Sequence, residues 1–147
     1  SSKMVLHYSI ELLHVLIYDK KYERALKYMS RCRILIKKIA DVDENYGILI
    51  DTMEFYIEFT KGNGVTEKLE NYYTNLHNSS DVYYFSWYYL ANTFSEAGMT
   101  SKSEECMKEA RDLLIREEKK ISDQAHRESY KVNHVLRREI AAPHLIQ

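Results

Sequence analysis

The stretch from Trp87 to Ala110 constrains the fold of this chain more than any other. Its first apolar residues are spaced so that they share one face of a helix, and they are Trp87, Leu90, Ala91 and Phe94. Gly98 follows, and glycine commonly ends a helix because it adopts the left-handed backbone conformation. Met107 and Ala110 then resume the helical spacing. The stretch therefore predicts two helices joined by a tight turn, with a positive φ at Gly98.

At these spacings the stretch resembles the tetratricopeptide repeat (TPR), a helix-turn-helix unit of 34 residues. The residues that match the family's pattern are Trp87, Leu90, Ala91, Phe94, Gly98 and Ala110. Three positions depart from it, since Ser103, Met107 and Ile115 stand where the family has alanine, phenylalanine and proline. The resemblance implies an all-α, TPR-like α-α superhelix. In that family the first helix of each repeat lines a concave groove, where partner peptides or helices bind.

Composition supports a helical protein. One proline and four glycines in 147 residues favour long helices and argue against an all-β fold. The net charge of -1 produces no overall field that would attract the chain to nucleic acid or to a membrane. No apolar run approaches the roughly 18 residues that span a bilayer. Two cysteines fit the reduced thiols of a cytoplasmic protein. The helical pattern begins almost at the first residue, which suggests a fragment of a longer protein.

We expect one domain, residues 4–142, with about three repeats. They fall at about 5–40, 44–77 and 82–120, and the second aligns about 34 residues before the third. The first departs more from the family's pattern. A capping helix over about 124–141 follows, started by Asp123 and ended before Pro143. Its few apolar residues suit a helix with one face on the last repeat and the other in water.

The capping stretch also loosely resembles the ends of TPR arrays in bacterial multidomain signalling regulators. The residues that carry this second resemblance are Arg127, Ser129, Tyr130, Asn133, Arg137 and Arg138. It implies a segment of a larger cytoplasmic signalling or transcription regulator. With few repeats, an exposed repeat end could also allow self-association.

Carried over by position, the family's groove would be lined by residues from all three repeats. They are His7, Ile10, His14 and Tyr18 in the first, Asp51, Glu54, Glu58 and Lys61 in the second, and Phe85, Tyr88, Asn92, Ser95 and Glu96 in the third. Such a groove has an acidic middle and an aromatic end, so it favours a partner with a basic centre and an apolar anchor. We therefore predict a protein–protein interaction module. The alternatives are a ligand- or peptide-sensing regulatory domain, and groove residues that are merely solvated or covered by neighbouring domains.

A second candidate surface is basic. Lys20, Arg24, Lys27 and Arg31 share one stripe at helical spacing. The stripe could contact the phosphates of nucleic acid or an acidic partner. A solvated outer face is the favoured interpretation, because no base-reading or stacking motif accompanies the stripe.

We predict no catalytic residue, metal or cofactor. His7 and His14 are seven residues apart, and His126 and His134 eight, whereas a strong helical zinc motif has two histidines four apart. Glu54 and Glu58 form an acid pair without a partner histidine, a nucleophile or a phosphate-binding loop. The chain is therefore not expected to be an enzyme.

Overall fold

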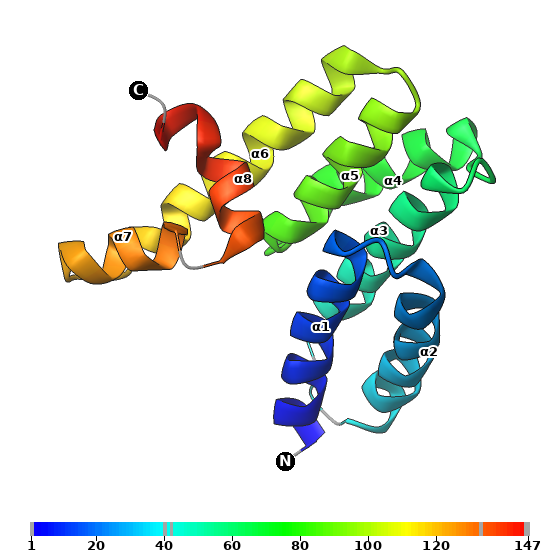
Figure 1. The fold of residues 1–147 in the computed structure, drawn as a ribbon, viewed down its shortest axis with the longest axis horizontal. Helices are drawn as coiled ribbons and strands as arrows, with labels where there is room; N and C mark the ends of the chain where they lie inside the picture. Colours follow the sequence, from blue (N-terminus) through cyan, green and yellow to red (C-terminus); the bar gives the residue numbers. More distant parts are fainter. Residues whose placement is uncertain (1, 40, 42, 133, 146–147) are drawn as a thin grey trace. The chain divides into compact units, whose positions relative to one another are not determined.

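The computed structural model describes residues 2–39, 41, 43–132 and 134–145. Over these residues the fold is all-α, with eight helices and no strand (Figure 1). The chain divides into two compact units, residues 1–64 and 65–147. The predicted second repeat, 44–77, spans the boundary between the units. The TPR-like superhelix therefore stays a prediction.

The first unit contains α1 (Ser2–Tyr18), α2 (Tyr22–Lys38) and α3 (Asn45–Thr60). α1 and α2 form an antiparallel hairpin, and α3 packs against α2 (Figure 1). The hairpin turns at Lys20, whose φ of 62° is left-handed, and the Lys21 N–H donates to the Leu16 carbonyl at 2.8 Å. The core of this unit is apolar and includes Leu13, Ile17, Ala25, Met29, Ile50, Met53 and Ile57.

The second unit contains α4 (Thr66–Asn78), α5 (Tyr84–Glu96), α6 (Thr100–Glu118), α7 (Gln124–Val132) and α8 (Val135–Leu145). α5 and α6 form its most extensively packed pair. α4 packs on α5, and α8 packs on both α6 and α7. The second unit is thus built around the α5–α6 hairpin.

The α5–α6 turn has the geometry that its sequence predicts. Gly98 has a φ of 74°, which confirms the predicted positive value. The Met99 N–H donates to the Phe94 carbonyl at 2.9 Å and the Gly98 N–H to the Ser95 carbonyl at 3.0 Å, so a Schellman motif ends α5. Ser103 Oγ donates to the Ala91 carbonyl at 2.8 Å and so joins α6 to α5.

The C-terminal region differs from the single helix that we predicted over 124–141. Asp123 starts a helix as expected, because its Oδ1 accepts the His126 N–H at 2.9 Å. However, α7 ends at Val132 and a separate helix, α8, begins at Val135. His134 Nδ1 accepts the Leu136 N–H at 3.2 Å, so this side chain caps a new first turn. The predicted stop before Pro143 is wrong, since α8 continues to Leu145.

Candidate interaction surfaces

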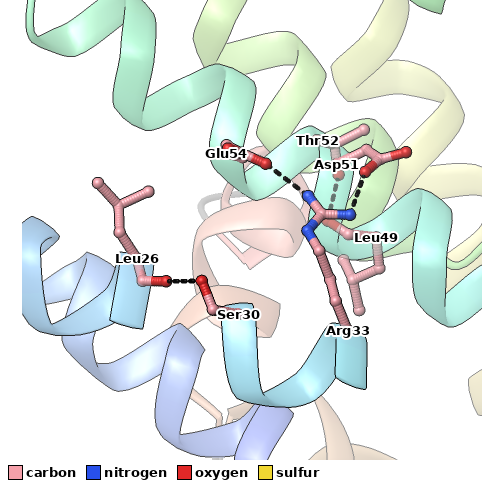
Figure 2. A network of polar contacts seen from close by, with 7 residues as sticks. All are labelled: Leu26, Ser30, Arg33, Leu49, Asp51, Thr52 and Glu54. Carbon is pink, nitrogen blue, oxygen red and sulfur yellow. Dashed lines mark hydrogen bonds and ion pairs between the residues drawn. The ribbon is translucent and has the colours of Figure 1, made fainter. Parts of the chain in front are cut away.

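The predicted acidic residues of α3 are engaged inside the first unit. Arg33 of α2 reaches α3 and bridges two carboxylates, with Nη1 at 2.6 Å from Asp51 Oδ1 and Nη2 at 2.5 Å from Glu54 Oε2 (Figure 2). Asp51 and Glu54 are three residues apart on one helix face, so a single guanidinium can reach both. Burial would lower the pKa of Arg33, but the bonds to Asp51 and Glu54 outweigh it and raise that pKa. These two carboxylates are therefore ion-paired within the chain.

The other predicted groove residues of the first unit are split between its interior and its surface. Ile10 and His14 are buried, whereas His7 and Tyr18 are exposed. Glu58 is half-buried. Lys61 forms an ion pair with Glu23 of α2, and the bond to Lys61 lowers the pKa of Glu23.

The predicted aromatic end lies on α5, where α8 and the residue before it cover part of it. Phe85 and Tyr88 are buried. The Phe85 ring lies 5.1 Å from the His134 ring, and the Tyr88 hydroxyl donates to Glu139 Oε2. Asn92 Nδ2 donates to the Tyr88 carbonyl at 3.0 Å within α5, and its side chain is half-buried. Ser95 and Glu96 are exposed at the end of α5.

The structure brings together two of the residues that carry the second resemblance. The Tyr84 and Tyr130 hydroxyls are 2.7 Å apart, and Arg137 Nε donates to the Tyr84 hydroxyl at 2.8 Å. The Arg137 guanidinium also lies 3.9 Å from the centre of the Tyr130 ring, within cation–π range. Burial raises the pKa of Tyr84, and the bond to Tyr130 adds to that effect. The cluster joins α5, α7 and α8, so the packing of these helices explains the presence of Tyr130 and Arg137.

The predicted basic stripe faces solvent. Its members, Lys20, Arg24, Lys27 and Arg31, are all exposed. None of them forms an ion pair with another residue that the structure describes. The Arg31 guanidinium lies 5.3 Å from the centre of the Tyr28 ring, a neighbour on the same helix. The stripe thus has the exposure that a polyanion contact requires.

Apart from Tyr18, which was predicted as a groove residue, sequence reasoning missed one surface, the outer face of α1. It consists of six large apolar side chains that are 36% to 63% exposed, namely Met4, Val5, Tyr8, Leu12, Val15 and Tyr18. The buried residues of α1, including Leu6, Ile10, Leu13 and Ile17, lie on the opposite side of the helix. The sequence carries a signal for this face, because α1 has more apolar residues than one face of a helix can hold.

The two cysteines are interior groups. Cys32 and Cys106 are both buried, and burial raises the pKa of each thiol, that of Cys106 to about 12. Such thiols stay protonated at neutral pH and are poor nucleophiles. Among the described residues, no three or more His, Cys, Asp or Glu side chains are grouped to hold a metal ion.

Two further observations bear on the kind of protein this is. In the part of the chain that the structure describes, every helix is too short or too polar to cross a membrane. Comparisons with protein-family models, with curated proteins and with solved structures found no match.

Proposed function

We propose that this chain is a protein–protein interaction module that binds a helix or peptide of a partner. The observation that supports the proposal is the outer face of α1. Its six side chains run from Met4 to Tyr18, a distance of about 21 Å along the helix. Exposed apolar patches of this kind on soluble chains commonly mark binding sites.

The composition of α1 strengthens this proposal. The helix has 17 residues, and Lys3 and Glu11 are its only Lys, Arg, Asp or Glu residues. A helix with apolar residues on two opposite faces is typically covered on both of them. The exposed residues also follow the spacing by which one helix binds along another. The two sequence resemblances add a context, a TPR-like segment of a larger cytoplasmic signalling regulator.

The proposal is tested by site-specific photo-crosslinking in cells. A photoreactive phenylalanine analogue replaces Tyr8 on the outer face of α1, and in a matched control it replaces Ile34, which is 56% exposed on α2. We expect discrete protein adducts from position 8 that disappear when Leu12→Lys and Val15→Lys are added. Equal adducts from both positions, or adducts that persist in the double variant, would contradict the proposed surface.

A second candidate function is contact with a polyanion through α2. It is favoured by the four exposed cations of the basic stripe, which form no ion pair with another residue that the structure describes. Retention on heparin should fall with salt, and replacing the four residues by glutamine should abolish most of it. The matched control replaces two lysines and two arginines elsewhere that are exposed and form no ion pair with another described residue, Lys68, Lys119, Arg116 and Arg138. If this control loses as much retention, the contact is non-specific.

A further inference from the structure

The outer face of α1 has the length and the chemistry of a helix–helix contact. Its members recur at intervals of three and four residues, with Tyr8, Leu12 and Val15 near the middle and Met4 and Tyr18 at the ends. We propose that a second copy of this chain covers this face, with the two α1 helices antiparallel about a two-fold axis close to Leu12. The inference rests on the proposed function and names the partner.

The buried area is sufficient for a stable dimer. The six side chains are 36% to 63% exposed, and a large side chain offers about 200 Å² when fully exposed. Each copy would therefore bury on the order of 600 Å² of apolar surface, or about 1,200 Å² for the pair, the lower end of stable specific interfaces. Because the same face is used twice, a second copy supplies an apolar strip of matching length and chemistry.

The helix dipole of α1 favours the antiparallel arrangement. The six side chains of the strip are uncharged, but the half-buried Glu11 lies beside Tyr8 and Val15 on the same side of the helix, so its two copies would come close to the axis. Antiparallel packing places the positive end of each helix dipole beside the negative end of the other. Parallel packing would pair like ends instead.

The first test is the mass of the chain in solution across a wide concentration range, measured by sedimentation equilibrium. We expect the intact chain to approach twice its monomer mass as concentration rises. Leu12→Lys with Val15→Lys should raise the dissociation constant at least ~100-fold, because each charge enters a symmetric interface twice. Ile34→Lys, at a residue of similar exposure on α2, should leave the dimer unchanged. The substituted side chains are exposed, so circular dichroism should show all variants folded.

Disulfide trapping tests the orientation. A cysteine at Leu12 should cross-link the two copies readily, because both copies of that residue lie close to the axis. A cysteine at Val5 should not, since the two copies of that residue would be about 20 Å apart along the helices. The native Cys32 and Cys106 are buried and do not compete. Trapping at Val5 as fast as at Leu12 would overturn the antiparallel arrangement.

Failure of the dimer and failure of the proposed function give different results. A chain that stays monomeric at all concentrations, while the crosslinker at position 8 captures a different protein, refutes the second copy but supports the interaction module. A monomeric chain without specific adducts at that position contradicts both. A crosslinked adduct with twice the mass of the chain, lost in the double variant, supports both.

Discussion

Replacing Trp87 by alanine should lower the free energy of unfolding by about 3–5 kcal/mol. Trp87 is 4% exposed on α5, and its ring meets the Tyr73 ring of α4 edge to face at 6.3 Å. The His77 ring of α4 lies 4.8 Å from it. Truncation removes roughly 150 Å² of buried apolar surface, worth about 4 kcal/mol at about 25 cal/mol per Å². Loss of the ring contacts adds to this cost, and relaxation of α4 reduces it.

The assay is urea unfolding followed by far-UV circular dichroism, because Trp87 is the single tryptophan and the variant has no tryptophan fluorescence. Trp87→Phe keeps an aromatic ring and should cost less than alanine. Ile34→Ala, at a residue that is 56% exposed, should change stability by less than about 0.5 kcal/mol. A loss below about 1 kcal/mol for Trp87→Ala would show that α4 and α5 do not pack through this ring.

Four further predictions use the same unfolding measurement. Gly98→Ala should cost about 1–2 kcal/mol, because its φ of 74° is strained for alanine although an added Cβ meets no atom within 4 Å. Gly47→Ala inside α3, where the space is also open, should instead stabilise by roughly 0.5–1 kcal/mol, and a loss there would contradict the helical conformation of that residue. Arg33→Ala should cost about 1–2 kcal/mol, because it leaves two carboxylates of α3 without their cation, and the cost should be smaller at high salt. In the control, Lys108→Ala breaks an exposed ion pair and should cost under about 0.5 kcal/mol. Equal losses for the two would mean that the Arg33 bridge adds nothing beyond a surface pair. Burial raises the pKa of the Cys106 thiol from 9.0 to about 12, so the contribution of the protonated thiol to the free energy of unfolding is complete below about pH 9. That contribution should be lost as the pH rises towards 12, by at most about 1.4 kcal/mol per pH unit, and Cys106→Ala should show a shallower decline.

The parts of the fold that could be predicted from sequence depend on local rules. The turn at Gly98 follows from the conformational freedom of glycine, and the start of α7 follows from the capping oxygen of Asp123. Trp87, Leu90, Ala91 and Phe94 are buried, as their spacing on one helix face predicts, whereas the burial of Tyr89 and Thr93 on other faces of α5 depends on packing that spacing does not give. The break before α8 was missed because His134 caps it through a side-chain bond that helical spacing does not encode.

The candidate surfaces depend instead on which helices meet, and spacing does not contain that information. From the sequence of α3 alone, Glu54 is predicted to line a groove. In the structure it forms an ion pair with Arg33 of α2, which is 21 residues earlier in the chain. Tyr88 reads as an aromatic anchor, yet its hydroxyl is bonded to Glu139 of α8, 51 residues later. The outer face of α1 is a second case in which helical spacing does not show which helices pack together. The sequence cannot rank the two opposite apolar faces of α1, and the packing against α2 decides which of them is left for a partner. Exposed apolar surface is therefore better evidence for a binding face in this chain than residue positions transferred from a repeat pattern.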